Sequence, residues 1–456
     1  MKNLFLKYKT YYKSNLALAI PVVISQLGHT LVHTADSVIV GHFAGTIPLA
    51  AVSLVNSVFT VIMVMGIGIA YGLTPLVAQE NGKQGYATCG KLLSNSLAIN
   101  FVAGILLFVL IYFGLLSVID HLDQTPAVVE AAKPYLSLLG ISIVPLMIFN
   151  TFKQFAEGLG FTKQAMTISI LGNVINVCLG IIFVKGMFGI KPMGVSGVGL
   201  STLIDRTLMA IAMAAYVFKS EHFKKYLRNF SLKQINRVIS GRILKIGAPV
   251  ALQYTFEVSA FSGAAIIIGT IGAVEQAAHQ VAIAMASMTY MMASGISAAA
   301  TIKTGNSFGR KDYKELRLSA ISNYQIVIVF MTIAAVVFIA FSNYLPWIYT
   351  TDKAVIAIAA QLLVVAGLFQ LFDGAQVVGL GILRGTGDVN IPTIITFLAY
   401  WVVGLPVGYY LGIVVGYGAE GIWYGLTLGL LVSAILLYLR FSKMTRDLMN
   451  RNVATV

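Results

Sequence analysis

The stretch Ala19-Ile20-Pro21-Val22 decides the fold, because it recurs in the second half of the chain as Gly247-Ala248-Pro249-Val250. Chance matches between two parts of a sequence are separated by many different numbers of residues, whereas a duplicated unit keeps one constant offset. The offset from Pro21 to Pro249 is kept almost unchanged along most of the chain, which indicates two similar halves. The further matches are Gly41 with Gly269, Gly82…Tyr86 with Gly309…Tyr313, Leu139-Gly140 with Ala366-Gly367, and Glu157-Gly158-Leu159-Gly160 with Arg384-Gly385-Thr386-Gly387.

The composition is that of a membrane protein. Of the 456 residues, 58% are hydrophobic and only 11% are charged, whereas a soluble protein carries about 25% charged residues. Each of twelve apolar segments reaches the roughly 20 residues that a membrane-spanning helix needs. A transmembrane β-barrel would instead show alternating segments of about ten residues. We therefore predict an all-α polytopic membrane protein. The segments lie near 15–41, 48–78, 90–118, 127–152, 162–184, 194–218, 243–270, 276–302, 317–349, 354–382, 391–415 and 420–440.

The net charge of +14 is distributed unevenly along the chain. Twenty-six lysines and arginines fall at the termini and in the even-numbered connections, and only Lys185, Lys191 and Lys353 fall in the odd-numbered ones. Basic residues concentrate on the cytoplasmic side of multi-pass membrane proteins. We therefore predict a multi-pass protein of the plasma (inner) membrane with both termini in the cytoplasm. Its basic residues would contact anionic membrane lipid rather than nucleic acid.

The repeat and the spans together predict the domain organisation. Each half has six spans, an even number, so it begins and ends on the same side of the membrane and the two bundles have the same orientation. They would therefore be related by a pseudo-two-fold axis along the membrane normal. Membrane transporters are often built this way, with the substrate site between the halves. We predict an N-terminal six-helix bundle over 1–218, a cytoplasmic basic connector over 219–242, a C-terminal six-helix bundle over 243–442 and a cytoplasmic tail over 443–456. We expect the protein to be a monomer.

Motifs of enzymes and cofactor sites do not occur in the sequence. It has no zinc-ligand spacing, no phosphate-binding glycine loop and no nucleophile elbow. Cys89 lies near the predicted cytoplasmic face and Cys178 inside a predicted span, so we expect no disulfide. We predict that the protein is not an enzyme and has no cofactor.

Three carboxylates, Asp36, Glu257 and Asp373, lie inside predicted spans. Each costs about 2.5–3.5 kcal/mol at the middle of a bilayer on insertion scales, so such residues are functional by default. A bound cation, a proton or a neighbouring polar group must offset this cost. Asp205 and Arg206 also lie inside a span, and we favour the interpretation that they pair with other helices and stabilise helix packing.

Polar side chains accompany the three acids at helical spacing. Residues three or four positions apart share a face of a helix, so we expect a polar pocket in each half. Asparagine in a span can equally hydrogen-bond a neighbouring helix, and the histidines can be ordinary helix contacts. The polar residues are Gln26, His29 and His33 before Asp36; Ser169, Asn173 and Asn176; Gln253 before Glu257; and Gln370 and Gln376 around Asp373.

Glycine and proline positions concern helix packing and bending. Small residues at every fourth position allow membrane helices to approach closely. A proline inside a span removes a backbone hydrogen bond and bends the helix, and we expect this at Pro21 and Pro249. The glycine patterns are Gly68 with Gly72, and Gly421 with Gly425 and Gly429.

The eighth span carries Met285, Met288 and Met292 on one face, with Tyr290 nearby. Methionine-rich surfaces adapt to varied ligands, so these four residues are candidates for the wall of a substrate cavity. Contact with the hydrophobic core or with lipid is the alternative interpretation.

Taken together, these features resemble the multidrug and toxic compound extrusion (MATE) family of antiporters, in its NorM-like branch. The resemblance covers nearly the whole chain. It implies export of organic, often cationic and amphipathic, drugs and toxic compounds in exchange for the coupling ion Na+ or H+. It also implies cation coupling at Glu257, Asp373 and Asp36, with Na+ as a candidate ligand of the first two. It rests on the two six-span halves, on Pro21…Asp36 running into Val40-Gly41-His42, on Arg384-Gly385-Thr386-Gly387-Asp388, and on Glu257 with Asp373.

Three other functions stay open on the sequence alone. A flippase for lipid-linked head groups shares the two-bundle plan but favours a cationic cavity, for which Arg206 is the main candidate. A membrane-embedded hydrolase needs a nucleophile with a base, or metal ligands, and His29 with His33 is a weak candidate for the latter. A passive channel fits poorly with two halves that carry acids away from a common axis.

Overall fold

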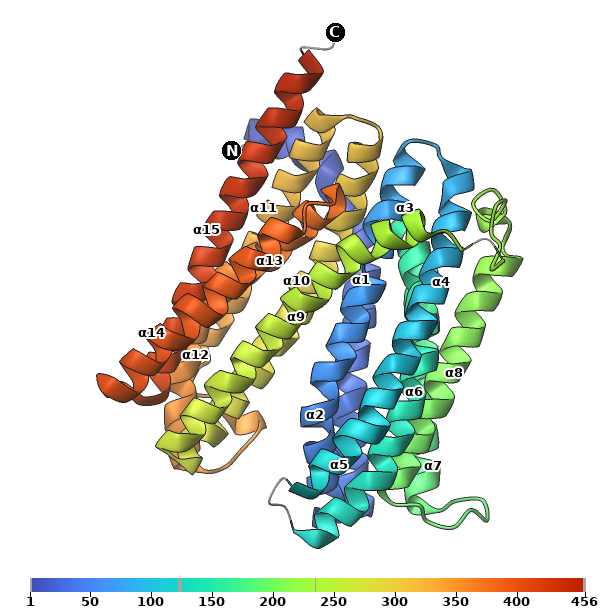
Figure 1. The fold of residues 1–456 in the computed structure, drawn as a ribbon. Helices are drawn as coiled ribbons and strands as arrows, with labels where there is room; N and C mark the ends of the chain where they lie inside the picture. The colour runs from blue at the N-terminus through green and yellow to red at the C-terminus, as the bar shows by residue number, and fades with distance from the viewer. Residues whose placement is uncertain (1, 122–124, 234, 454–456) are drawn as a thin grey trace. The chain divides into compact units, whose positions relative to one another are not determined.

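The structure is a computed structural model and describes residues 2–121, 125–233 and 235–453. These residues form helices and turns without a strand, and 12 helical segments are long and apolar enough to cross a membrane (Figure 1). The predicted all-α polytopic fold is therefore confirmed. Residue 234 of the predicted connector and residues 454–456 of the predicted tail lie outside the described residues.

Each predicted apolar segment corresponds to one helix or to helices joined end to end. The helices of the first half are α1 (Lys2–Phe43), α2 (Thr46–Ala70), α3 (Leu73–Gly82), α4 (Tyr86–Val109), α5 (Leu116–Val118), α6 (Pro126–Gly158), α7 (Thr162–Lys185) and α8 (Val195–Lys219). Those of the second half are α9 (Arg237–Ile271), α10 (Ala273–Gly309), α11 (Tyr313–Ala340), α12 (Lys353–Thr386), α13 (Asn390–Phe397), α14 (Leu405–Tyr409) and α15 (Gly418–Val453). Short 3₁₀ or π turns are η1 (Leu110–Leu115), η2 (Ile119–His121), η3 (Glu221–Phe223), η4 (Leu345–Ile348), η5 (Leu398–Gly404) and η6 (Tyr410–Val414).

The same turn ends two equivalent helices, α6 and α12, which explains part of the sequence repeat. Gly160 and Gly387 have φ of 90° and 84°, a left-handed conformation that glycine adopts without the strain of a β-carbon. In each turn the glycine N–H donates to the carbonyl oxygen three residues earlier, that of Glu157 or of Arg384. The repeated Gly-x-Gly pattern is therefore a helix stop in both halves.

Contacts divide the chain into two compact units whose boundaries differ from the predicted halves. The C-terminal unit comprises Met1–Val23 and Leu252–Val456, and the N-terminal unit comprises Ile24–Ala251. Each boundary falls two residues beyond a proline, Pro21 in α1 or Pro249 in α9. The first segments of α1 and α9 are therefore exchanged between the predicted halves.

Specific contacts account for this exchange. In the C-terminal unit, Asn15 Nδ2 donates to Ser322 Oγ at 2.6 Å and to the carbonyl oxygen of Ser319 at 3.3 Å. In the N-terminal unit, Arg242 Nη2 lies 3.6 Å from Glu80 Oε1. The sequence predicts that the connector ends at residue 242 and that the C-terminal bundle begins after it. In the structure the first turns of α9 pack in the N-terminal unit, which extends to Ala251.

One central helix organises each unit. In the N-terminal unit α6 lies against α2, α4 and α8, and α7 lies against α8 (Figure 1). In the C-terminal unit the repeat-equivalent helix α12 lies against α10, α11 and α15. The indole of Trp423, which is fully buried beside α12, donates from Nε1 to His279 Nδ1 at 3.1 Å. The central helices carry several of the polar residues that concern function.

The predicted tail over 443–456 is helical as far as Val453, because α15 continues past the end of its apolar segment. Arg440 Nε donates to Asp388 Oδ2 at 2.6 Å, and the Thr445 side chain is buried. No glycine or proline follows Gly429 in this helix to stop it.

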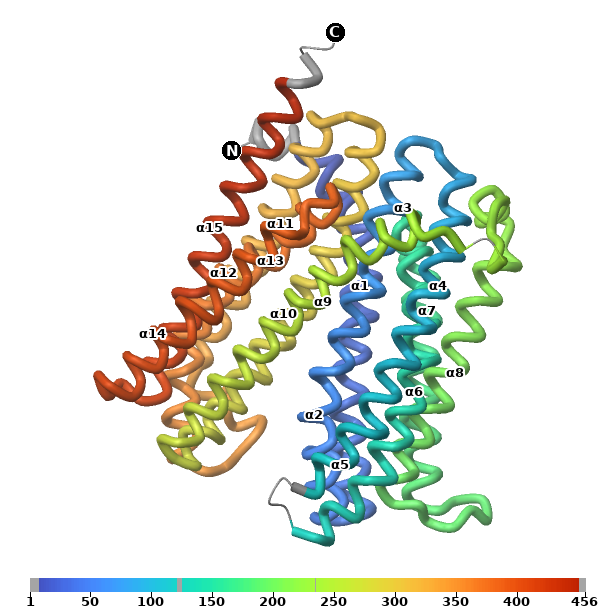
Figure 2. The backbone as a smooth tube through the Cα atoms, viewed as in Figure 1, coloured from blue at the N-terminus to red at the C-terminus, as the bar shows by residue number. Residues whose placement is uncertain are grey.

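The predicted connector is anchored to the N-terminal unit. Its backbone folds into a compact loop at the end of α8 (Figure 2), with Phe223 and Tyr226 buried. The Tyr226 hydroxyl donates to Asn81 Oδ1 at 3.1 Å, and burial raises the pKa of this hydroxyl above its usual value, so it keeps its proton. Asn95 Oδ1 accepts from the Asn236 N–H at 2.8 Å. The basic side chains of this loop are exposed: Lys224, Lys225, Arg228, Lys233 and Arg237.

Small residues bring helices together at the predicted places. A β-carbon on Gly425 of α15 would overlap the backbone of Gly408 in α14, and one on Gly429 would lie 2.5 Å from the carbonyl oxygen of Ala399. In the N-terminal unit, a β-carbon on Gly68 would overlap the backbone of α9. The interpretation that these glycines serve packing is confirmed.

Gly425→Ala is expected to destabilise the protein by about 3 kcal/mol, because the added methyl group forces two helix backbones apart. The measurement is the unfolding transition in mixed detergent micelles. Gly241→Ala in α9 is the control, since its β-carbon would meet no atom within 4 Å and alanine favours a helix by about 0.5–1 kcal/mol over glycine. Equal stability of the two variants would contradict the close packing of α15.

Candidate functional site

The acids of the second half form one cluster in the C-terminal unit. Glu257 in α9 and Asp373 in α12 are 6% and 2% exposed. They interact electrostatically with each other, and Tyr290 of α10 interacts with both. The Tyr290 hydroxyl is also a hydrogen-bond partner of Glu257. Three helices therefore bring two carboxylates and a phenol together.

Uncharged hydrogen-bonding groups flank this acidic cluster. Gln376 Nε2, one turn after Asp373, donates to the Tyr400 hydroxyl oxygen at 2.9 Å. One turn before Asp373, Gln370 Oε1 accepts from the Thr289 hydroxyl at 2.7 Å. Both glutamines are fully buried. Their amides can orient polar groups beside the acids without adding charge.

Arg384 and Gln253 lie where α9 approaches the end of α12. The Arg384 guanidinium is centred 5.7 Å from the Tyr254 ring and interacts electrostatically with Glu257. Gln253 Nε2 donates to the carbonyl oxygen of Val389 at 3.2 Å. The predicted supporting residue Gln253 therefore joins α9 to the start of α13, one turn from Glu257.

Arg206 is the centre of a second polar cluster, in the N-terminal unit. Its guanidinium, in α8, donates from Nη1 to Ser142 Oγ of α6 at 2.8 Å. It interacts electrostatically with Asp205, Tyr135 and Asp36. These contacts agree with the interpretation that Asp205 and Arg206 join helices, and they place Asp36 in the same cluster.

The two predicted asparagines lie on α7 beside this cluster. Asn176 Nδ2 donates to Thr202 Oγ1 at 3.2 Å, and Asn176 is a hydrogen-bond partner of Asp205. Asn173 is 7% exposed, and a β-carbon on Gly28 would lie 2.6 Å from its Nδ2. Asn176 therefore joins α7 to α8, and Asn173 lies close to α1 at Gly28.

The predicted polar stripe of α1 is buried unevenly. Asp36 is 3% exposed, whereas Gln26 and His29 are half-buried and His33 is exposed. Gln26 Nε2 donates to the Tyr71 hydroxyl at 3.3 Å. Helical spacing places the four residues on one face. Asp36 is the buried member of this stripe. His29 and His33 also interact electrostatically with Arg206.

The three predicted acids have no ion-pair partner among the residues that the structure describes. The ion pairs there, with N–O distances up to 3.9 Å, involve other carboxylates. Oδ1 of Asp36 also has no hydrogen-bond partner. Within 2–121, 125–233 and 235–453, no group of three or more His, Cys, Asp or Glu is suited to a metal ion. Asp36, Glu257 and Asp373 are therefore buried carboxyl groups that form no direct ion pair within the described chain, although Arg206 and Arg384 interact electrostatically with Asp36 and Glu257 over longer distances.

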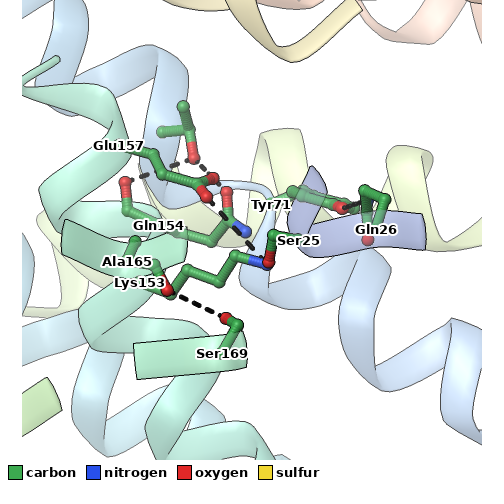
Figure 3. A network of polar contacts seen from close by, with 9 residues as sticks. Ser25, Gln26, Tyr71, Lys153, Gln154, Glu157, Ala165 and Ser169 are labelled. Carbon is green, nitrogen blue, oxygen red and sulfur yellow. Dashed lines mark hydrogen bonds and ion pairs between the residues drawn. The ribbon is translucent and has the colours of Figure 1, made fainter. Parts of the chain in front are cut away.

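A buried ion pair lies near the end of α6. Lys153 Nζ is 3.9 Å from Glu157 Oε1 and donates to Ser25 Oγ at 3.2 Å (Figure 3). The side chains of the pair are 5% and 4% exposed. Lys153 and Arg384 are among the 26 basic residues counted toward the cytoplasmic side, and the structure shows that both are buried.

The methionine face of α10 divides into buried and accessible parts. Met285 belongs to the hydrophobic core of the C-terminal unit, together with Phe369 and Trp423. Met288 is 40% exposed, and Met292 is half-buried. Met285 thus fits the core interpretation, while Met288 and Met292 stay candidates for substrate contact.

Several members of the two clusters were not found from the sequence. Tyr135 and Ser142 lie two helical turns apart on α6, so their spacing was a signal that could have found them. Thr202, Tyr254 and Tyr400 had no such signal, because their partners lie on other helices. Only packing between helices reveals them.

Comparisons with known proteins place this architecture in a family. The sequence profile of the MatE family matches residues 21–182 and 249–410, so its two matches begin at the two equivalent prolines of the repeat. The chain is 32% identical over 440 residues to the probable multidrug resistance protein NorM of Agrobacterium fabrum, covering 95% of this chain and 94% of that protein. It is 33% identical over 439 residues to the multidrug resistance protein NorM of Photobacterium profundum, covering 95% of each.

Solved structures have the same fold. The eukaryotic MATE transporter AtDTX14 superposes with a TM-score of 0.87 at 19% identity, covering 98% of this chain and 99% of that chain. A crystal structure of MATE in the bent conformation gives 0.88 at 21% identity, covering 99% of both. With the two profile matches and NorM relatives at 32% and 33% identity, the chain belongs to the MatE family, the MATE transporters that its motifs resemble.

Proposed function

We propose that this protein is a cation-coupled antiporter that exports organic, often cationic, drugs and toxic compounds by alternating access, with Na+ or H+ as the coupling ion. The observation that carries this proposal is the burial of Asp36, Glu257 and Asp373 in spans without an ion-pair partner among the described residues. Relatives that span 95% of the chain are named multidrug resistance proteins, which supports drugs as the substrate class.

Glu80 is buried but pairs with the more exposed Lys83 and Arg242. Apart from Glu80, each unit contains one more buried carboxylate than buried cation among the described residues. One proton or one monovalent cation per unit would neutralise the excess. The buried charges are Asp36, Glu157, Asp205, Lys153 and Arg206 in the N-terminal unit, and Glu257, Asp373 and Arg384 in the C-terminal unit.

Competition for the same negative charge can make the exchange obligatory. A carboxylate attracts a cationic drug in one state of the transporter and a coupling ion in the other. If binding of one excludes the other, the two affinities are linked and each gradient drives the other flux. In the C-terminal unit, Tyr290 and the amides beside Asp373 would orient either ligand, while Met288 and Met292 would contact apolar parts of a drug.

Charge balance determines whether membrane voltage contributes. One monovalent ion exchanged for one monovalent drug moves no net charge across the membrane. A second coupling ion would add about 2.3 kcal/mol of driving force per 100 mV. The equal excess of negative charge in the two units is consistent with two coupling ions per cycle.

The chain is a multi-pass membrane protein, and we propose the plasma (inner) membrane, cytoplasmic termini and a monomeric state for it. The exposed lysines and arginines of the loop after α8 are suited to anionic lipid head groups on the cytoplasmic side.

The flippase alternative gains no support. A head-group phosphate needs cations that are free to bind it, whereas Lys153 and Arg206 donate to Ser25 and Ser142 and interact with carboxylates. The NorM relatives are likewise named for multidrug resistance.

Drug counterflow in proteoliposomes tests the proposed function. A fluorescent cationic drug is followed while a sodium gradient, a proton gradient and a membrane potential are imposed one at a time. Uphill drug movement driven by one ion gradient is the expected result, and the effect of voltage then gives the stoichiometry. Drug movement that never exceeds equilibrium under any gradient would exclude an antiporter.

A further inference from the structure

The Lys153–Glu157 pair takes no part in the proposed binding of ion or drug, yet its burial is costly. A buried ion pair adds little stability compared with well-packed apolar residues, and a specified arrangement of helices is its best-attested use. The ammonium has two oxygen partners, Glu157 Oε1 at 3.9 Å and Ser25 Oγ at 3.2 Å. The arrangement that it can specify is therefore the position of α1 against α6.

Ser25 lies at an informative point of α1. It follows Pro21 by four residues and is fully buried. Because proline has no N–H, the carbonyl of Ala17 lacks its helical donor, and α1 can bend there. The boundary between the two units also falls here, between Val23 and Ile24. Lys153 thus holds α1 one turn after the point where the helix can bend.

The second half has an uncharged contact at the equivalent position. Gln253 follows Pro249 by four residues, as Ser25 follows Pro21. Its Nε2 donates to the Val389 carbonyl oxygen at 3.2 Å and to Thr393 Oγ1 at 3.0 Å. Both units therefore hold their first helix one turn beyond the proline, and only the N-terminal unit uses a charged group.

We propose that Lys153 is a positioning residue for transport: held by Glu157, it binds Ser25 and keeps the α1 segment that carries Gln26 and Asp36 in place against α6. The segment beyond the proline then moves with the N-terminal unit as one body. Without this contact the segment becomes mobile, and Asp36 is displaced from the cluster around Arg206. The effect on transport rests on the proposed function, whereas the effect on the position of α1 does not.

Distance measurement between spin labels tests the position of α1 directly. Labels at Leu31 of α1 and Ile141 of α6, which are 58% and 44% exposed, are introduced after the native Cys89 and Cys178 have been replaced. In Lys153→Met the distance distribution is expected to broaden and shift.

Ser25→Ala is expected to cause the same change, and it decides the test by itself if Lys153→Met does not fold. Lys163→Met removes an exposed lysine of α7, and Ser37→Ala removes an α1 hydroxyl that bonds only its own helix, so both should keep the wild-type distances. Wild-type distances in Ser25→Ala and in any folded Lys153→Met would overturn the proposal.

Transport kinetics provide the second measurement. Lys153→Met is expected to lower kcat about tenfold with the drug KM changed less than twofold, because the drug-binding groups are intact. The double variant with Ser25→Ala should lose no more than the single variant, since both remove one contact. If the kcat losses of Lys153→Met and Ser25→Ala add up in the double variant, the contact between Lys153 and Ser25 is not the cause of the slower transport. If the wild type shows no ion-driven transport, the proposed function fails while the spin-label distances still decide the role of Lys153.

Discussion

Replacing Asp373 by asparagine, or Glu257 by glutamine, is expected to reduce ion-driven drug efflux to the level of liposomes without protein. Each substitution keeps the shape of the side chain and removes the charge for which drug and coupling ion compete. Because neutralising an acid inside the bilayer removes a cost of about 2.5–3.5 kcal/mol, insertion and yield should be retained. The measurement is dye export from proteoliposomes under imposed sodium or proton gradients.

Two acids of the same unit provide matched controls. Asp352 caps α12 by accepting the N–H groups of Ala354 and Val355, a role that asparagine fills equally well. Asp352→Asn is therefore expected to export normally, as is Glu275→Gln at the start of α10. Normal export by both Asp373→Asn and Glu257→Gln would refute their assignment as coupling residues.

Arg206→Met is expected to cause the largest loss of stability, about 3–5 kcal/mol, because it removes one partner of a buried charge cluster. Asp36 and Asp205 would then lie in an apolar unit without the cation that interacts with both. Ser142 would also lose the donor at 2.8 Å. The measurement is the free energy of unfolding of the purified protein in mixed detergent micelles.

A second substitution separates charge from packing at Arg206. Adding Asp205→Asn to Arg206→Met removes one uncompensated acid, so the double variant should be more stable than the single one. Arg228→Met, at an exposed position of the loop after α8, is the control and should leave unfolding unchanged. A wild-type unfolding transition in Arg206→Met would show that Arg206 is not part of the helix packing.

The fold could be predicted from the sequence because its signals are local. A span is recorded in one continuous apolar run, and the duplication in one nearly constant offset, so neither depends on which helices meet. The same holds for Asp36, Glu257 and Asp373: a carboxylate in an apolar run is conspicuous by itself. Helical spacing found Gln376 and Asn176 beside buried acids, since residues on one face need no other helix to be recognised.

The polar partners could not be predicted in this way. Lys153 and Arg384 looked like ordinary basic residues at span ends, and only the structure shows that they are buried. His33 fitted the stripe of α1 by spacing, yet it is exposed while Asp36 is buried. Whether a side chain at a given spacing is buried depends on the neighbouring helix, which local periodicity does not record.

The sequence by itself determined that this is a duplicated, twelve-span MATE protein with acids in its interior, because hydropathy and repeat offset are properties of single segments. Only the tertiary structure decided that α1 and α9 exchange their first segments, that Lys153 holds Ser25, and which residues surround each acid. The repeat makes the reason plain: Glu157 and Arg384 occupy equivalent turns but carry opposite charges. The partners of these two residues lie on other helices, which are distant in the sequence and are brought close only by packing.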